Sequence, residues 1–301
     1  MAPHPPDVFV NHGKNVLITG CSSGFGHALV PRFLERGWTV VATMRDLENR
    51  RDRFTQELQK YPDRLFLRSL DVTDEKERKE TAEFVRTRLQ HLDVLVNNAG
   101  YGLFGAVEDL SEKQLREQFD VNFFGAVFVT RELLPFLRES KGRILNISSV
   151  IGTFGMPLSS GYASSKFALE GLSECLYYEM KPFGVQVCLV KPGRHRTNFS
   201  QNMVWGEESQ NPGSPYYPMT KRYLQRKDAL SQKVVVPQEN VVRAVLRLAE
   251  AKSIPLRYGV GKDTALVKAF QTLLPERWMT FILSKTYQKT LFPPSPTTPP
   301  R

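Results

Sequence analysis

The chain alternates short, almost wholly apolar runs with longer segments in which apolar residues recur at helical spacing. The apolar runs predict strands at 15–20, 38–43, 64–72, 93–98, 142–148, 185–192 and 256–261. The segments between them predict helices at about 25–36, up to about 60, 75–90, 111–138, 162–182 and from Pro237 onward. Strands that are apolar on both faces need helices on both faces, so the pattern predicts an α/β fold with a doubly wound parallel sheet.

The sequence has no internal repeat and no obvious linker, so we expect a single domain over residues 14–290. From 198 to about 236 the chain is rich in Pro, Gly, Trp, Tyr and Met without a clean period, which predicts a lid inserted over one end of the sheet. Residues 1–13 are expected to form an N-terminal tail. Residues 291–301 are rich in proline and predict a disordered tail.

Composition limits the class and the compartment of the protein. The 301 residues are 41% hydrophobic and 24% charged, which is typical of a soluble globular protein. Three scattered cysteines exclude a disulfide framework, and no CxxC or His-rich spacing indicates a metal site, so we expect a cytoplasmic chain without a metal. No apolar stretch reaches the roughly 18 residues of a spanning helix. The N-terminus also lacks the basic and apolar halves of a secretory signal.

The net charge of +10 favours anionic partners without naming one. Basic clusters at 45–53 and 221–227 are interrupted by acidic or apolar residues, which indicates solvated faces with some attraction for an anionic cofactor. Nucleic-acid binding would need basic residues interleaved with aromatic ones on one face, or a known motif, and the sequence has neither. We therefore expect no nucleic-acid partner.

The segment TGCSSGFG at 19–26 joins a predicted strand to a predicted helix and holds Gly20, Gly24 and Gly26. Glycine lets the backbone turn tightly and lets an anionic group reach the free N–H groups at a helix N-terminus, where phosphate binds well. The spacing G-x-x-x-G-x-G differs from the common G-x-G-x-x-G fingerprint, so alone it equally fits a structural turn. The phosphate-binding interpretation therefore depends on the other motifs.

The end of the second predicted strand, TVVATMRD, bears on which dinucleotide would bind. Folds that hold the free ribose of NAD tend to place an acidic residue here, whereas an arginine accommodates the additional phosphate of NADP. Met44 is neutral and Arg45 follows it, and a guanidinium fork suits phosphate. We therefore expect NADP(H) to be preferred over NAD(H), with a surface pair of Arg45 and Asp46 as the alternative.

Two further motifs lie downstream. The run DVLVNNAG at 93–100 ends a strand in small residues, which leaves room for a ligand but also fits a plain turn. Tyr162 and Lys166 are four residues apart on a predicted helix and so share one face. An ammonium group beside a phenol lowers the phenol's pKa from its ordinary value of about 10, which acid–base catalysis at neutral pH needs. Alone, this Tyr-x-x-x-Lys spacing is common by chance.

Taken in order, these motifs resemble those of the classical branch of the short-chain dehydrogenase/reductase family, over residues 14 to about 290. The matching segments are TGCSSGFG, Asp71–Val72, NNAG at 97–100, Asn122, Ser149, YASSK at 162–166 and PGRHRT at 192–197. In detail, TGCSSG, ATMRD and YASSKFALEGLSE look most like the members that include estradiol 17-beta dehydrogenase and related retinol dehydrogenases. The resemblance implies a Rossmann-like fold and an NADP-dependent oxidoreductase, a carbonyl reductase or dehydrogenase acting on CH–OH groups.

The resemblance implies four catalytic residues. Tyr162 would give or take the hydroxyl proton, and Lys166 would lower the pKa of that phenol and hydrogen-bond the nicotinamide ribose. Ser149 would orient and polarise the substrate oxygen, and Asn122 would hold a water in a proton relay. The family spacing of 13 residues before the tyrosine selects Ser149 rather than Ser148, which would complete the strand.

The resemblance also implies a cofactor-binding set distributed along the chain. The residues that would line the phosphates are Gly20, Ser22, Ser23, Phe25 and Gly26. The residues that would hold the adenosine half are Arg45 at its phosphate, Asp71 and Val72 at the adenine, and Asn98, Ala99 and Gly100 at the ribose. The residues at the nicotinamide end would be Tyr162, Lys166, Pro192, Gly193 and Thr197.

One segment departs from the family pattern. Members usually carry apolar or small residues directly after Pro-Gly, and this chain has Arg194 and His195 there. The backbone contacts could persist, but packing around the nicotinamide would differ. The two basic side chains would either favour an acidic substrate or turn to solvent.

The substrate is expected to be largely apolar, and a steroid or retinoid would follow from the resemblance. The residues on which this rests are Phe154, Met203, Trp205, Tyr216, Tyr217 and Met219, which could equally be core filling. A different class of function is a catalytically silent NADP(H)-binding regulator or sensor. The intact set of Asn122, Ser149, Tyr162 and Lys166 favours the enzyme.

Two partner surfaces are expected. The segment LLPERWMTFILSKTYQKTLF at 273–292 sets aromatic and aliphatic residues among Arg277, Lys285 and Lys289, which fits a helix in peripheral contact with a membrane or, equally, core packing of a last helix. By resemblance, a homodimer or homotetramer would form through the helices around Asn122 and after Tyr162.

Overall fold

The computed structural model describes residues 13–193, 203–231 and 237–292. The expected tails, 1–13 and 291–301, lie almost entirely outside these ranges. Arg194, His195 and Thr197 also lie outside the described residues.

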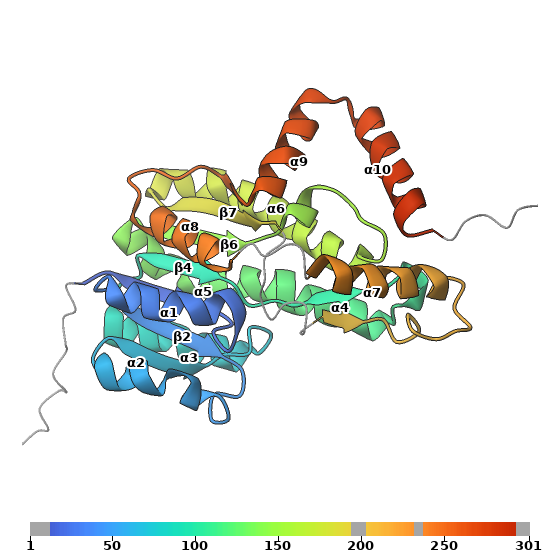
Figure 1. The fold of residues 1–301 in the computed structure, drawn as a ribbon. Coiled ribbons are helices and arrows are strands. Elements are labelled where there is room, and N and C mark those ends of the chain that lie inside the picture. The colour runs from blue at the N-terminus through green and yellow to red at the C-terminus, as the bar shows by residue number, and fades with distance from the viewer. Residues whose placement is uncertain (1–12, 194–202, 232–236, 293–301) are drawn as a thin grey trace, which may run out of the picture.

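A seven-stranded parallel sheet forms the centre of the molecule, which confirms the predicted fold class (Figure 1). In spatial order its strands are β3 (Leu65–Ser69), β2 (Thr39–Met44), β1 (Asn15–Ile18), β4 (Val94–Asn97), β6 (Arg143–Ile147), β7 (Gln186–Pro192) and β9 (Arg257–Val260). The chain moves outward from β1 to β3 and then returns to place β4 on the other side of β1. This reversal creates the crevice at the carboxyl ends of β1 and β4 in which folds of this kind bind ligands.

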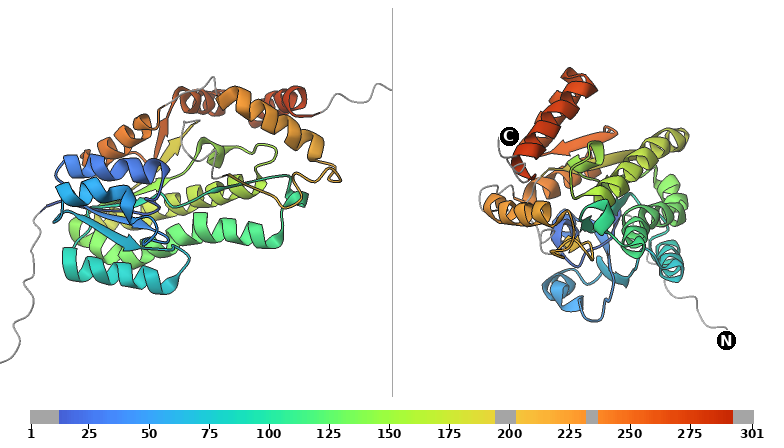
Figure 2. Two further views of the ribbon diagram at one scale, coloured as in Figure 1. Left: turned by 60° about the horizontal axis from the view of Figure 1, so that its bottom comes forward. Right: turned by 90° about the vertical axis from the view of Figure 1, so that its right-hand side faces the viewer.

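Helices cover both faces of the sheet (Figures 1 and 2). On one face lie α1 (Gly24–Glu35), α2 (Thr55–Lys60) and α8 (Glu239–Glu250), and on the other α3 (Glu75–Phe84), α5 (Gly125–Ser140) and α6 (Ser160–Met180). The side chains of each strand divide between the two cores by simple alternation. Val16 and Ile18 of β1 pack with the α1 layer, whereas Leu17 between them packs with the α5 layer.

Three predicted helices differ in detail from the structure. The helix expected at 75–90 consists of α3 followed by a π-helical segment at Val85–Leu89. The helix expected up to residue 60 begins only at a short turn of 3₁₀ helix, Arg51–Phe54, followed by α2. The helix expected at 111–138 is divided into α4 (Glu112–Phe119), a π-helical segment at Asp120–Phe124, and α5. Such π segments insert one residue into a helical turn and re-aim a side chain, and this one carries Asn122.

In its described residues, 203–231, the region expected to form a lid contains two elements. Strand β8 (Met203–Trp205) pairs in parallel with β5 (Gly102–Phe104), and α7 (Tyr217–Ser231) follows. Residues of this region that precede α7 are hydrogen-bonded to α4 and to the segment just before α4. Ser214 Oγ donates to Asp109 Oδ1 at 2.6 Å, and Gln114 Nε2 of α4 donates to the Trp205 carbonyl at 3.0 Å. This part of the region is therefore fixed to the body of the protein, while the action of the region as a lid stays a prediction.

The C-terminal helices α9 (Lys262–Leu273) and α10 (Glu276–Thr290) stand out from the body as an inverted V (Figure 1). No residue of α10 is fully buried, so its apolar side chains are not core filling. Exposed apolar residues here are Phe270, Leu273, Trp278, Phe281, Ile282 and Phe292. Within the described ranges, no helix is both long enough and apolar enough to span a bilayer.

Candidate active site

The glycine turn after β1 forms a cradle at the N-terminus of α1. Gly20 has φ of 71°, and a Cβ built on it would lie 2.8 Å from Ala99 Cα, so both the backbone conformation and the close approach favour glycine. A Cβ on Gly26 would lie 2.5 Å from the Gly20 carbonyl oxygen. The first turn of α1 contains no acidic residue. A close-packed turn beneath a helix N-terminus that bears no negative charge fits a pyrophosphate group, so the residues present fit a dinucleotide.

The NNAG segment after β4 is joined to this turn by hydrogen bonds. Asn98 Nδ2 donates to the carbonyls of Thr19, at 2.8 Å, and of Gly20, at 3.1 Å. The Thr19 hydroxyl accepts from the backbone N–H groups of Asn98, at 3.0 Å, and of Ala99, at 2.9 Å. The two loops therefore form one rigid unit at the crevice between β1 and β4.

The residues expected at the adenosine end lie at the carboxyl ends of β2 and β3. Arg45 Nη1 is 3.9 Å from Asp71 Oδ2, and the Arg45 side chain is 68% exposed. Val72 is buried against Gly125. Arg53, which the sequence did not single out, donates from Nη1 to the Ser22 carbonyl at 2.7 Å. The glycine turn is joined to the end of β2 by the Cys21 N–H, which donates to the Thr43 carbonyl at 2.8 Å. Among the described residues the exposed Arg45 guanidinium is held by a long ion pair, which leaves it accessible to an anion.

The expected catalytic residues meet where α6 crosses the end of β6. Tyr162 and Lys166 lie on one face of α6 and are both buried, and the Lys166 ammonium is 5.9 Å from the centre of the Tyr162 ring. Lys166 Nζ donates to the Ile147 carbonyl at 2.9 Å. Ser149 follows β6 and hydrogen-bonds the Tyr162 side chain. The structure therefore brings Ser149, Tyr162 and Lys166 together, although they lie on separate elements.

Burial controls the protonation of this group in the free protein. Desolvation raises the pKa of Tyr162 to about 12, and the hydrogen bond with Ser149 opposes part of that rise. Desolvation also lowers the pKa of Lys166 to about 8, and the Glu170 carboxylate opposes it. The resemblance implies that Lys166 lowers the pKa of the Tyr162 phenol. This effect stays a prediction for the enzyme with its cofactor bound.

Asn122 anchors the loop that follows the NNAG segment. Its Oδ1 accepts from the Tyr101 N–H at 3.0 Å, and its Nδ2 donates to the Tyr101 carbonyl at 2.9 Å and to Ser165 Oγ at 3.1 Å. A Cβ on Gly100 would lie 2.9 Å from Asn122 Oδ1 and 3.8 Å from Lys166 Nζ, so the three residues adjoin. The side-chain amide is therefore engaged with the protein, and the expected water-holding role stays a prediction.

Of the remaining cofactor residues, the structure describes Pro192 and Gly193. Pro192 ends β7, and the Gly193 N–H donates to the Val260 carbonyl at 3.0 Å. Both lie at the same edge of the sheet as Gly20, Asn98 and Ser149, because all follow the carboxyl ends of parallel strands. Thr197 lies outside the described residues.

Aromatic side chains line one side of Tyr162. The Phe104 ring lies 5.7 Å from the Tyr162 ring, 6.1 Å from Trp205 and 6.3 Å from Tyr223, measured between ring centres. Trp205 and Tyr223 are themselves 5.7 Å apart. Since Trp205 and Tyr223 belong to β8 and α7, the segment expected to be a lid packs two aromatic side chains against Phe104, which itself lies beside Tyr162.

The comparison with known protein families agrees with this geometry. Residues 14–208 match the family model described as short chain dehydrogenase. The chain belongs to the short-chain dehydrogenase/reductase family. As a member of that family it is an oxidoreductase.

This short-chain dehydrogenase is similar to relatives along most of its length. It is 33% identical over 274 residues to the 3-ketodihydrosphingosine reductase of Bacteroides thetaiotaomicron, covering 90% of this chain and 97% of the relative. A solved structure of a short-chain dehydrogenase from Streptomyces avermitilis superposes with a TM-score of 0.75 at 34% identity, covering 92% of this chain and 99% of the other. The structure of ElxO with NADP bound gives a TM-score of 0.69 at 26% identity, covering 84% and 99%.

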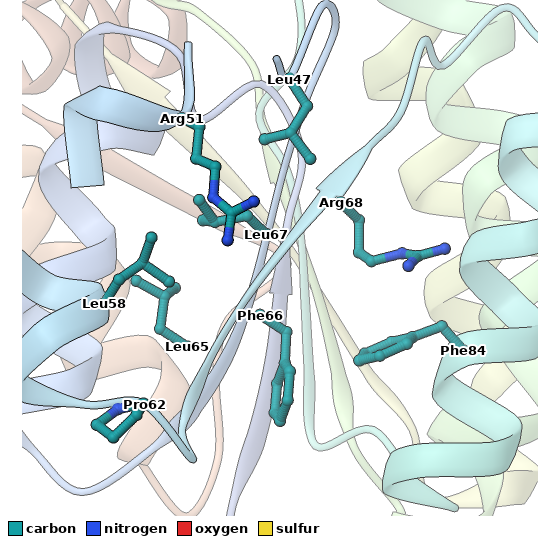
Figure 3. Close-up of a pocket in the computed structure, with 9 residues that line it drawn as sticks. All are labelled: Leu47, Arg51, Leu58, Pro62, Leu65, Phe66, Leu67, Arg68 and Phe84. Atoms are coloured by element: carbon teal, nitrogen blue, oxygen red, sulfur yellow. The ribbon is translucent and has the colours of Figure 1, made fainter. Parts of the chain in front are cut away.

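A separate pocket lies against β3, at the edge of the sheet (Figure 3). Leu65 and Leu67 point to one side of the strand, and Phe66 and Arg68 to the other (Figure 3). The full lining is Leu47, Arg51, Leu58, Pro62, Leu65, Phe66, Leu67, Arg68 and Phe84. None of the residues expected to bind cofactor or substrate lines this pocket, so it is not the active site of this short-chain dehydrogenase.

The structure adds residues to which the sequence motifs gave no role of their own. Thr19 and Arg53 contact the glycine turn, Phe104 contacts Tyr162, and Glu170 contacts Ser148. Thr19 is part of the TGCSSGFG motif and could have been found there. The others follow ordinary local patterns, and only their tertiary neighbours distinguish them.

Proposed function

We propose that this protein is an NADP(H)-dependent oxidoreductase that transfers hydride between nicotinamide and a carbonyl or alcohol group of a largely apolar substrate. The observation that carries the proposal is the convergence of Ser149, Tyr162 and Lys166 beneath an aromatic wall. These groups lie at the carboxyl edge of the sheet, beside a cradle that fits a dinucleotide.

In this proposal each residue has a defined task. A bound nicotinamide supplies or accepts the hydride. The Tyr162 hydroxyl gives its proton to the substrate oxygen during reduction, and the Tyr162 phenolate takes the proton of the alcohol during oxidation, while the Ser149 hydroxyl orients that oxygen. The Lys166 ammonium stabilises the phenolate form of Tyr162 and binds the ribose. Asn122 completes a proton path by holding a water beside Lys166.

The preference for NADP(H) rests on Arg45. Its guanidinium is largely exposed at the end of β2, and the structure of ElxO, 26% identical, contains NADP. Replacing Arg45 by Ala should weaken binding of NADPH about tenfold or more and leave binding of NADH almost unchanged. Equal effects on both cofactors would refute the assignment of Arg45 to the adenosine phosphate.

The apolar substrate class rests on Phe104 beside Tyr162, and on Trp205 and Tyr223 packed against Phe104. The relative from Bacteroides thetaiotaomicron is named for reduction of a 3-ketodihydrosphingosine, a ketone on a long alkyl chain. We therefore place long-chain ketones beside the steroids and retinoids that the motif detail suggested. Aromatic and aliphatic walls with a few polar groups are typical of sites for such ligands.

The direct test is NADPH oxidation, with NADH in parallel, over a panel of long-chain ketones, aldehydes, steroids and retinoids. We expect turnover of at least one apolar member with NADPH. The Trp205→Ser variant should raise the KM for that substrate more than the KM for NADPH. Turnover restricted to small polar ketones would refute the apolar assignment.

The alternative is a silent regulator that binds NADP(H) without turnover. The complete set of Asn122, Ser149, Tyr162 and Lys166 disfavours it, because a pure binder has no need of all four. Tight binding of NADPH together with no turnover in either direction over the whole panel would establish this alternative.

We further propose a homodimer or homotetramer. The supporting observation is a set of exposed aromatic side chains on and beside the helices around Asn122 and after Tyr162, namely Phe124 at 41% exposure, Phe167 at 46% and Tyr178 at 61%. Light scattering should give a multiple of the 34.3 kDa chain mass. A monomer at micromolar concentration would refute this assembly.

We also propose that this enzyme is cytoplasmic and contacts membranes through α10. Trp278, Phe281 and Ile282 are 45–54% exposed on one face of the helix, and Lys285 and Lys289 continue the same face. The Lys285 ammonium lies 5.7 Å from the Phe281 ring. Aromatic residues next to cations fit the headgroup region of an anionic bilayer.

Vesicle flotation tests this membrane contact. With vesicles of phosphatidylserine and phosphatidylcholine, the protein should float, and the Trp278→Ser/Phe281→Ser variant should not. Val107→Ser, which removes an apolar side chain that is 64% exposed and lies far from α10 in the sequence, serves as the control and should float like the wild type. Retention of the wild-type protein in the soluble fraction would refute the contact.

A further inference from the structure

Three consecutive residues at the end of β6 are each hydrogen-bonded to one of three residues spaced four apart on α6. The pairs are Ile147 with Lys166, Ser148 with Glu170, and Ser149 with Tyr162. Two of these helix residues, Tyr162 and Lys166, have assigned roles in the proposed reaction. Glu170 has none, yet it is joined to the same strand end by the same kind of contact.

Glu170 is a buried carboxylate surrounded by cations. Its side chain is 8% exposed, and it accepts from Ser148 Oγ at 2.8 Å through Oε1 and from Arg257 Nε at 2.9 Å through Oε2. Lys191 Nζ is 3.9 Å from Oε2. A buried carboxylate is costly unless it is paired, and these contacts provide the pairing. Glu170 therefore joins α6 to the ends of β6, β7 and β9.

We propose that Glu170 is a positioning residue of the active site, which holds Ser148 so that its neighbour Ser149 faces Tyr162, and which stabilises the ammonium form of Lys166. The inference rests on the proposed function for the roles of Ser149 and Lys166. Both effects follow from one carboxylate, because one oxygen binds the serine and the charge lies one helical turn from the lysine.

The electrostatic surroundings agree with this role. Burial lowers the pKa of Lys166 to about 8, and the Glu170 carboxylate is the cause that raises it again. Glu174 of α6 shares its partner, Arg257 of β9, with Glu170. Lys191 and the Cys188 thiol of β7 also face Glu170, and burial raises the pKa of that thiol to about 12. The strand end of β6 contributes only the uncharged Ser148. The Glu170 carboxylate is therefore the negative charge that stabilises the ammonium form of Lys166.

Glu170→Gln separates the two effects, because its amide oxygen can still accept from Ser148 while the charge is lost. The titration of Lys166 can be followed by NMR of ¹³Cε-labelled lysine, with Lys166→Met to assign the signal. In Glu170→Gln the titration should move to lower pH by about one unit. In Arg257→Gln, which removes a cation near the intact carboxylate, it should move to higher pH. This measurement needs no turnover and so separates a failure of this inference from a failure of the proposed function.

The kinetic counterpart uses the pH dependence of kcat with the best substrate of the panel. Glu170→Gln should shift the alkaline limb to lower pH, and Ser148→Ala should lower kcat about tenfold without moving that limb, because only the placement of Ser149 changes. A purely structural role would lower the melting temperature and leave both the Lys166 titration and the limb in place. That result, or an unchanged titration in both charge variants, would overturn the proposal.

Discussion

The packing at Gly26 allows a prediction with a worked magnitude. Gly26 is buried in the first turn of α1, and a Cβ there would lie 2.5 Å from both the Gly20 carbonyl oxygen and Asn98 Nδ2. Neither atom can move freely, because Asn98 Nδ2 holds the carbonyls of Thr19 and Gly20. Inserting a methyl group into such packing costs about 1–3 kcal/mol. Gly26→Ala should therefore lower the free energy of unfolding by that amount and displace the glycine turn.

The assay is urea unfolding followed by circular dichroism, with NADPH affinity measured in parallel. Gly171→Ala is the matched control, because Gly171 lies exposed inside α6 with no atom within 4 Å of the added carbon. That change should stabilise the protein by about 0.5–1 kcal/mol and leave NADPH affinity unaltered. Gly26→Ala should bind NADPH at least about tenfold more weakly. If Gly26→Ala matched the wild type in both stability and affinity, the described cradle would be wrong.

Two other predictions concern buried titratable groups. Burial raises the pKa of Cys21 and of Cys188 to about 12, whereas Cys175 is exposed, so iodoacetamide at pH 8 should label the native protein once, at Cys175; peptide mapping that finds rapid labelling of a buried thiol would contradict this. Folding lowers the pKa of Lys166 from 10.5 to about 8, so between these values the unfolded chain binds more protons and stability rises with pH. Relative to Lys166→Met, the wild type should gain up to about 3 kcal/mol between pH 7 and pH 10.5, and a flat difference in urea unfolding would refute it.

Much of the fold could be predicted because parallel strands and their helices leave strong local patterns. In the strand NVLI every residue after Asn15 is apolar because both faces of the strand are covered, and the glycine turn follows it directly. The parts that were not predicted depend on partners distant in the chain. Strand β5 is only three residues long and exists because β8 pairs with it about a hundred residues later.

In the candidate site too, contacts set by local spacing could be predicted, and contacts between distant segments could not. Tyr162 and Lys166 share a helix face, so their proximity follows from sequence spacing alone. The contact of Phe104 with Tyr162 and the approach of Trp205 depend on how β5 and β8 pack, which no local spacing encodes. The sequence also could not predict how deeply Tyr162 and Lys166 are buried. Desolvation by this burial is the largest cause of the pKa shifts of both groups in the free protein.

The most direct test of the proposed function compares the wild type with Tyr162→Phe in two measurements on the same preparations, binding of NADPH and its oxidation with the best substrate. The variant lacks only the hydroxyl, so its affinity for NADPH should remain within about threefold while turnover falls by about 10²–10⁴. Turnover that persists in Tyr162→Phe at the wild-type rate would show that the proton comes from elsewhere and would contradict the proposed function.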